Sequence, residues 1–159
     1  MKIGVVGIGQ NMRGDDAAGP AAVRMWQHLR VEAAGGSEIK VRIVEQPGLD
    51  LLEALEGVEA AVLVDAIQSG GEPGSVRQLA IEDLDSAETR KGGMHSWGVA
   101  ETLALGRLLD QLQGNLTVRV VGIEAERVEF GAALSETVRR SLPDASALIQ
   151  AQVETFLGA

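Results

Sequence analysis

The sequence of 159 residues contains no cysteine. Disulfides, thiolate nucleophiles, iron–sulfur clusters and zinc sites built on cysteine are therefore excluded. Aromatic residues are also scarce, at 3% of the chain, and tyrosine is absent. Stacking platforms for bases or sugars are accordingly not expected. The hydrophobic core has to be built on leucine, valine, isoleucine and alanine instead.

Basic residues and long hydrophobic runs are in short supply as well. The chain has 14 Lys and Arg against 23 Asp and Glu, a net charge of −9, whereas a nucleic-acid-binding protein presents a basic face. No stretch approaches the roughly 18 apolar residues of a membrane span, and the apolar run at the N-terminus, about six residues long, is shorter than the core of a signal peptide. We therefore expect a cytoplasmic protein with no nucleic-acid or membrane partner.

Hydrophobic residues make up 45% of the chain, which is enough for the core of one domain spanning residues 1–159. Apolar runs predict strands at residues 2–6, 39–44, 60–64 and 116–123, and helical spacing of apolar residues predicts helices at 20–30, 51–55, 96–111, 135–142 and 145–157, the last two broken at Pro143. This alternation predicts an α/β fold of three layers, a doubly wound, mostly parallel twisted sheet of about five strands with helices on both faces.

One connection departs from the parallel pattern. The loop from Asp65 to Val76, of about ten residues without helical spacing, is too short for a parallel crossover. We therefore expect residues 76–81 to form an antiparallel strand, and we place it at the edge of the sheet.

Sheets of this kind bind ligands beyond the carboxyl ends of their strands, where the strand order reverses. The first and third strands are expected to be neighbours at that point. Five residues then become candidates for a site: Gly9, Asp15, Asp16, Gly19 and Asp65.

A dinucleotide site is the main rival interpretation of the first loop. Gly7 and Gly9 open a glycine fingerprint, but Met12 stands where its third glycine belongs. The start of the following helix, which would cradle a phosphate, carries Asp15 and Asp16, and two carboxylates repel phosphate. We therefore disfavour nucleotide binding.

The aspartates also allow a structural interpretation. Aspartate is a favoured helix N-cap, worth about 1 kcal/mol, so Asp15→Asn is expected to lose at most about 1–2 kcal/mol of cap and dipole stability. Capping explains one of Asp15 and Asp16 but not both, because adjacent charges repel each other. Asp65 directly follows a buried apolar run, where a carboxylate is costly unless it is paired or liganded. We therefore favour a functional role for Asp65.

The chain has two histidines. His28 lies late in the first predicted helix, where we expect a surface residue. His95 follows a glycine pair at the start of a helix, and the residue pattern fits a ligand and a surface residue equally. Two carboxylates and one imidazole would suit zinc, nickel, iron or manganese and leave coordination positions open.

Four blocks of the chain share the pattern of one protein family. They are residues 7–19 (GIGQNMRGDDAAG), 64–66 (VDA) with the Gly/Pro-rich loop through residue 74, 95–101 (HSWGVAE), and 121–124 (VGIE) with residues 130–135. In order and spacing they resemble the nickel–iron hydrogenase maturation endopeptidases, whose first block reads GxGN-x-x-RGDD-x-x-G. Gln10 departs from this pattern, because it stands where the family carries asparagine.

The resemblance implies an endopeptidase that removes the C-terminal peptide from the precursor of a hydrogenase large subunit after nickel insertion. It implies that Asp16, Asp65 and His95 contact the metal, a nickel ion carried by the substrate, and we place Asp16 near the attacked bond as the catalytic residue. Zinc or cadmium could occupy the site in the isolated protein, which we expect to be a monomer with the precursor as its partner. Two alternatives stay open: a non-cleaving, metal-recognising chaperone of the precursor, and a metal-dependent hydrolase of small substrates on the same fold.

The predicted ligand set also implies a pH dependence. An imidazolium cannot bind a metal, so with a His95 pKa of about 6.5 metal affinity should weaken as the pH falls through roughly 6.5 to 5.5. Asp16 and Asp65 are expected to remain mostly ionised over that range.

Overall fold

The computed structural model describes residues 1–30, 37–84 and 98–158. The strands are β1 (Lys2–Ile8), β2 (Glu38–Val44), β3 (Ala60–Ile67), β4 (Val76–Leu79) and β5 (Thr117–Glu124). The helices are the 3₁₀ turn η1 (Gly14–Ala17) and the α-helices α1 (Ala18–Leu29), α2 (Leu49–Leu55), α3 (Ile81–Leu84), α4 (Val99–Leu108) and α5 (Glu136–Leu157).

The five strands form one sheet in the order β2-β1-β3-β5-β4. The first four are parallel to one another, and β4 pairs with β5 in the antiparallel direction at the edge. The predicted mixed sheet and its antiparallel edge strand are therefore confirmed. The order reverses between β1 and β3, so the carboxyl ends of these two strands form the expected switch point.

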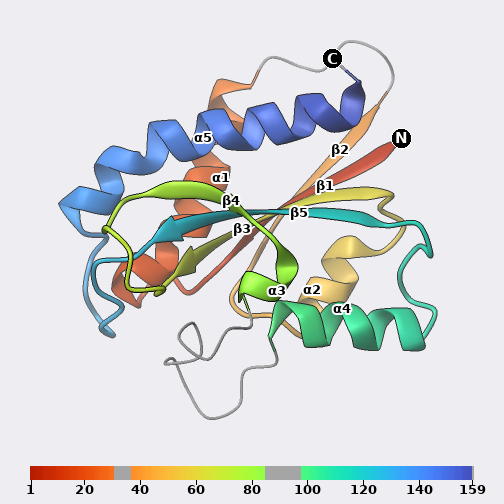
Figure 1. Ribbon diagram of the computed structural model, residues 1–159, viewed down its shortest axis with the longest axis horizontal. Coiled ribbons are helices and arrows are strands. Elements are labelled where there is room, and N and C mark those ends of the chain that lie inside the picture. Colours follow the sequence, from red (N-terminus) through yellow and green to blue (C-terminus); the bar gives the residue numbers. More distant parts are fainter. Residues whose placement is uncertain (31–36, 85–97, 159) are drawn as a thin grey trace.

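Helices cover both faces of the sheet, as predicted (Figure 1). One apolar cluster joins α1 and α5 to one face, with Trp26 and Ile149 among its buried members. The other cluster joins α2 and α4 to the opposite face, with Leu52 and Leu103 among its members. The central strands β1 and β3 are buried along most of their length, because both of their faces pack against helices.

The predicted break at Pro143 is wrong, because α5 runs unbroken from Glu136 to Leu157. Proline inside a helix lacks one backbone donor and costs about 3 kcal/mol or more. The helix carries its buried face on both sides of the proline, with Val138 and Leu142 before it and Ile149 and Val153 after it. Each such side chain contributes about 1.5–3 kcal/mol on burial, which offsets the loss at one position.

Two predicted apolar faces are shorter than expected. Leu29 and Leu109 are exposed, although both lie in the helices that apolar spacing predicts at residues 20–30 and 96–111. The second follows from the end of α4, which stops at Leu108 where Asp110 adopts a positive φ of 53°. In the described residues no helix has both the length and the apolar character required to cross a bilayer.

Candidate functional site

The carboxyl ends of β1 and β3 place Asp65 at the centre of the sheet edge. Asp65 pairs with Ile8 of β1 on one side and with Gly122 of β5 on the other. Two residues after Asp65 the strand β3 ends at Ile67. The side chain is half-buried, so it is enclosed by neighbouring strands and still reaches the surface.

Two glycines allow the first loop to come close to this edge. Gly9 has a φ of 144°, and a Cβ atom there would collide with the carbonyl oxygen of Asp16. A Cβ atom on Gly19 would collide with the carbonyl oxygen of Val64, the residue before Asp65. Both positions therefore require glycine, and the result is that η1 and the start of α1 press directly against the ends of β1 and β3.

Asp16 lies beside Asp65 as a consequence of this packing. Its Oδ2 accepts a hydrogen bond from the backbone N–H of Gln10 at 2.8 Å. Burial raises the pKa of Asp16, although the Gln10 hydrogen bond and the nearby charge of Arg13 act in the opposite direction. Gln10 thus supplies its backbone to the site, which any residue type could do.

The carboxyl of Asp65 is the more strongly perturbed of the two. Burial, followed by repulsion from the neighbouring Asp16 charge, raises the pKa of Asp65 to about 8, while a hydrogen bond from the Ala66 backbone lowers it. The expectation that Asp65 stays ionised between pH 6.5 and 5.5 is therefore wrong. The structure brings two predicted site residues together in an arrangement that disfavours having both of them charged.

Asp15 has a different environment, and its predicted role as a cap of the first helix is wrong. Its carboxylate is fully buried and accepts four hydrogen bonds. They come from the N–H groups of Glu126 (2.9 Å), Arg127 (3.1 Å) and Ser135 (2.6 Å) and from the Ser135 hydroxyl (2.8 Å). Ser135 is the N-cap of α5, so Asp15 anchors the start of a helix 120 residues away in the chain.

Backbone hydrogen bonds reinforce this junction between the β1–η1 loop and the β5–α5 loop. The N–H of Asp15 donates to the Arg127 carbonyl at 2.8 Å, and the N–H of Gly14 donates to the Ala132 carbonyl at 3.0 Å. A third bond joins Gly131 N–H to the Met12 carbonyl at 2.6 Å. The loop that carries Asp16 is therefore fixed at several points on both sides of Asp15.

Glu124, at the carboxyl end of β5, is a buried carboxylate to which sequence analysis gave no role. It accepts hydrogen bonds from the N–H of Ser69 at 2.8 Å and from the Ser69 hydroxyl at 2.6 Å. Its backbone bonds to Gly74 and Ser75, so it holds the loop between β3 and β4. The signal that singled out Asp65, an acidic residue directly after a buried apolar run, is present at Glu124 too.

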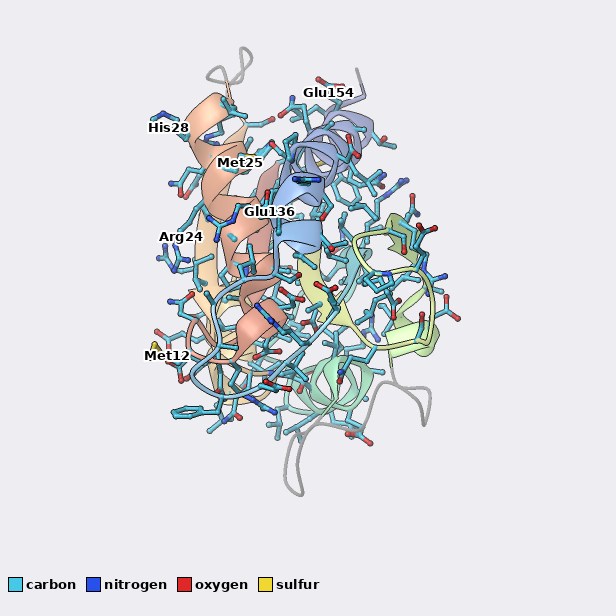
Figure 2. All side chains as sticks on the ribbon, turned by 90° about the vertical axis from the view of Figure 1, so that its left-hand side faces the viewer. Met12, Arg24, Met25, His28, Glu136 and Glu154 are labelled. Atoms are coloured by element: carbon cyan, nitrogen blue, oxygen red, sulfur yellow. The ribbon has the colours of Figure 1, made fainter. Side chains whose placement is uncertain are left out.

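Of the two histidines, His28 lies within the described residues and His95 does not. His28 is exposed near the end of α1, as predicted. Figure 2 shows it at the opposite end of the molecule from Met12, which lies in the loop that leads to Asp16. His95, the third predicted metal ligand, lies outside the described residues. Within the described ranges no three acidic or histidine side chains gather as a metal site would require.

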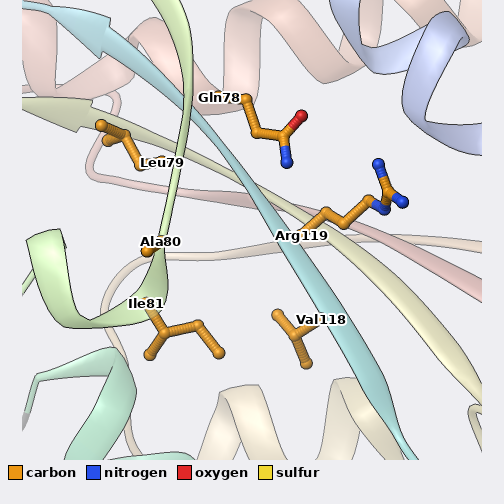
Figure 3. Close-up of a pocket in the computed structure, with 6 residues that line it drawn as sticks. All are labelled: Gln78, Leu79, Ala80, Ile81, Val118 and Arg119. Atoms are coloured by element: carbon orange, nitrogen blue, oxygen red, sulfur yellow. The ribbon is translucent and has the colours of Figure 1, made fainter.

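One hollow of about 440 Å³ lies away from this edge (Figure 3). It is lined by residues 78–81 and by Val118 and Arg119 near the start of β5. The Arg119 guanidinium donates a hydrogen bond to Gln152 at 2.8 Å and lies over the ring of Phe156. Because it is at the amino end of β5, this hollow does not belong to the site around Asp65.

Comparison with known proteins decides the family. The model of the family described as hydrogenase maturation protease matches residues 34–152. The chain belongs to the hydrogenase maturation protease family. The matched segment contains Asp65 and Glu124 and begins after Asp16.

Individual relatives agree with this assignment. Protein FrxA of Pyrococcus furiosus is 33% identical over 112 residues, which cover 67% of this chain and 80% of the relative. The solved structure of the hydrogenase maturating endopeptidase HybD from E. coli has a TM-score of 0.77 at 24% identity, covering 98% of this chain and 93% of HybD. The maturation protease HycI from Thermococcus kodakarensis has a TM-score of 0.65 at 21% identity, covering 93% and 89%. The two solved structures show that the fold is shared.

Proposed function

We propose that this family member is an endopeptidase that removes the C-terminal peptide from the precursor of a nickel–iron hydrogenase large subunit, in the cytoplasm and after nickel insertion. The single observation that supports this proposal most is the pair Asp16 and Asp65 at the switch point of the sheet. Burial disfavours the charged forms of both carboxyl groups, and repulsion from the Asp16 charge adds to this effect at Asp65. A cation between them would relieve that repulsion.

The cation in this proposal is the nickel ion of the substrate. Carboxylate oxygens and a neutral imidazole are suitable donors for a divalent transition metal. Asp16 and Asp65 supply two oxygen donors from fixed backbone positions, and His95 is proposed as the third ligand. Recognition of nickel in the precursor would make cleavage conditional on metal insertion.

Asp16 is the proposed general base. Its raised pKa makes the ionised carboxylate a stronger base than an ordinary aspartate. Its half-exposed position leaves it accessible to a water molecule and to the bond under attack. Asp65, at the more enclosed position of the pair, is proposed to bind the metal and not to transfer the proton.

The experiment that tests this proposal is cleavage of purified precursor, with and without nickel, followed by intact mass spectrometry. We expect the nickel-loaded precursor alone to lose a C-terminal peptide. Binding of the loaded precursor without any loss of mass would favour the chaperone alternative. Equal cleavage of both precursors would contradict nickel recognition.

A further inference from the structure

Phe130 is an aromatic side chain that the fold leaves on the surface. The chain has two tryptophans, two phenylalanines and no tyrosine. Of those that the structure describes, Trp26 is buried and Phe156 packs against the cluster that joins α1 and α5 to the sheet. Phe130 is 80% exposed, and within the described part of the chain it belongs to neither apolar cluster. Packing of the core therefore does not explain this aromatic residue.

The backbone of Phe130 is held in place although its side chain is exposed. The Ala132 N–H donates to the Glu129 carbonyl at 3.2 Å, and Gly131 adopts a φ of 79°, which makes a tight turn with Phe130 at its tip. The Gly131 N–H donates in turn to the Met12 carbonyl at 2.6 Å, and so joins this turn to the first loop. The turn is ordered before a partner arrives, which lowers the entropy cost of binding through it.

Met12 adds a second exposed apolar side chain on the adjoining loop. It is 63% exposed, and Figure 2 shows it at the outline of the molecule. The hydrogen bond from the Gln10 N–H to Asp16 Oδ2 closes the loop in which Met12 lies. Four residues of chain keep the Cα atom of Met12 within about 14 Å of that of Asp16. We call Met12 and Phe130 the apolar knob, and its position makes it continuous with the proposed catalytic site.

Charge and size indicate how the apolar knob is used. The neighbouring exposed side chains carry both signs, with Arg127 between Glu126 and Glu129, so a partner is not selected by charge. A phenylalanine buries at most about 250 Å², whereas a stable interface between two proteins buries about 1,600 Å² in total. The knob is too small to hold two copies of this chain together. It suits an apolar contact within the larger interface that a protein substrate forms around Asp16.

We propose that the apolar knob inserts into an apolar hollow on the folded body of the substrate protein, beside its nickel site. The inference rests on the proposed function for its choice of partner. A protruding side chain requires a concave surface, which a folded domain offers and an extended C-terminal peptide does not. Buried aromatic contacts of this kind carry much of the binding energy of an interface. The knob is remote from the reacting atoms, so its loss should raise KM and leave kcat unaltered.

The test measures the affinity of full-length variants for nickel-loaded precursor by calorimetry, together with KM and kcat. Phe130→Ser should weaken binding at least about tenfold and Met12→Ser about threefold, with the thermal midpoint unchanged because both side chains are exposed. The weakening should be equal at low and high salt, since an apolar contact is not screened. Leu29→Ser is the matched control, an exposed leucine next to His28 at the far end of α1, and should change nothing.

A synthetic peptide with the C-terminal sequence of the precursor separates the body of the substrate from the segment that is removed. Wild type and Phe130→Ser should bind this peptide equally weakly, and weaker binding by Phe130→Ser would overturn the inference. Unchanged affinity of both variants for the whole precursor would also overturn it. So would a wild-type dimer in sedimentation that Phe130→Ser dissociates, because a second copy would then cover the knob.

The failure of this inference is distinguishable from that of the proposed function. If the wild type binds the precursor without cleaving it, the proteolytic function fails, and the affinities of the two variants still decide the role of the knob. If the wild type cleaves the precursor and neither variant loses affinity, the knob fails and the proposed function stands. A wild type that neither binds nor cleaves the precursor overturns both.

Discussion

Four carboxylates lie at one edge of the sheet, and they form two pairs with opposite properties. Asp15 and Glu124 are buried and accept hydrogen bonds from loops that they hold in place. Asp16 and Asp65 are half-buried, and a raised pKa shows that the fold disfavours their charged forms. We call the first two the anchoring pair and the second two the open pair.

The comparison teaches that proximity to the site does not define a role in it. Asp15 and Asp16 are adjacent in sequence, yet one joins two loops and the other faces Asp65. The anchoring pair satisfies the donors of this edge, and the open pair retains acceptor capacity for something from outside. Variants of the two pairs should therefore fail in different ways.

The largest expected effect is on cleavage in the open pair. Asp65→Ala should reduce cleavage of nickel-loaded precursor by at least about a hundredfold, because one of the two carboxyl groups proposed to bind the substrate nickel is removed. Circular dichroism and a thermal melt should show a folded protein. An unfolded variant would show that Asp65 supports the fold, as the anchoring pair does. Full activity would show that Asp65 does not belong to the site.

Asp15→Asn should instead destabilise the fold by about 3–5 kcal/mol, because an amide presents N–H donors to a ring of N–H donors. This loss of stability is larger than the about 1–2 kcal/mol expected from the sequence if Asp15 were a helix cap. Denaturant unfolding measures the difference. Asp16→Asn is the matched control, and it should lose cleavage while its free energy of unfolding changes little.

Metal binding to the isolated protein should depend on the state of Asp65. A carboxyl group with a pKa of about 8 must lose its proton before it binds a divalent metal. Affinity for Ni²⁺ should therefore fall as the pH drops below about 8, by up to about tenfold per unit, and binding should release a proton. Calorimetry in two buffers of different ionisation enthalpy measures that release. His28→Ala should bind as the wild type does, since His28 is exposed on α1.

A smaller effect is expected at Glu124. Glu124→Gln keeps one carbonyl oxygen for the Ser69 N–H, and its amide can donate to the Ser69 hydroxyl. The loss of stability should be about 1–2 kcal/mol, with the loop between β3 and β4 loosened first. Hydrogen exchange at Ser69 and Gly74 tests this expectation, and protection equal to the wild type at both would contradict it.

Sequence reasoning predicted the sheet and its antiparallel edge because hydrophobic runs and connection lengths are local properties. It placed Asp65 and Asp16 at the carboxyl edge for the same reason. It assigned the wrong role to Asp15, because the donors that surround it come from Glu126, Arg127 and Ser135. Those partners are brought in by the tertiary fold, and no local pattern records them.

The same limit explains Glu124 and Pro143. An acidic residue follows an apolar run at both Asp65 and Glu124. Glu124 differs because its carboxylate accepts hydrogen bonds from Ser69, in the loop between β3 and β4. Pro143 is a local signal for a helix end, but the apolar face of α5 on both sides of it overrides that signal. In each case a long-range contact decided between two locally acceptable outcomes.

The most direct test of the open pair is the free energy of unfolding of Asp65→Asn relative to the wild type, as a function of pH and without metal. The folded wild type holds a proton on Asp65 between its ordinary pKa of 3.8 and about 8, where the unfolded chain does not. The wild type should therefore lose stability relative to the variant as the pH rises through that range. We predict that Asp65→Asn is close to neutral at pH 4 and stabilising by at least about 2 kcal/mol at pH 8. A variant that is destabilised at pH 8 would show that the Asp65 carboxylate supports the fold, and would contradict the account.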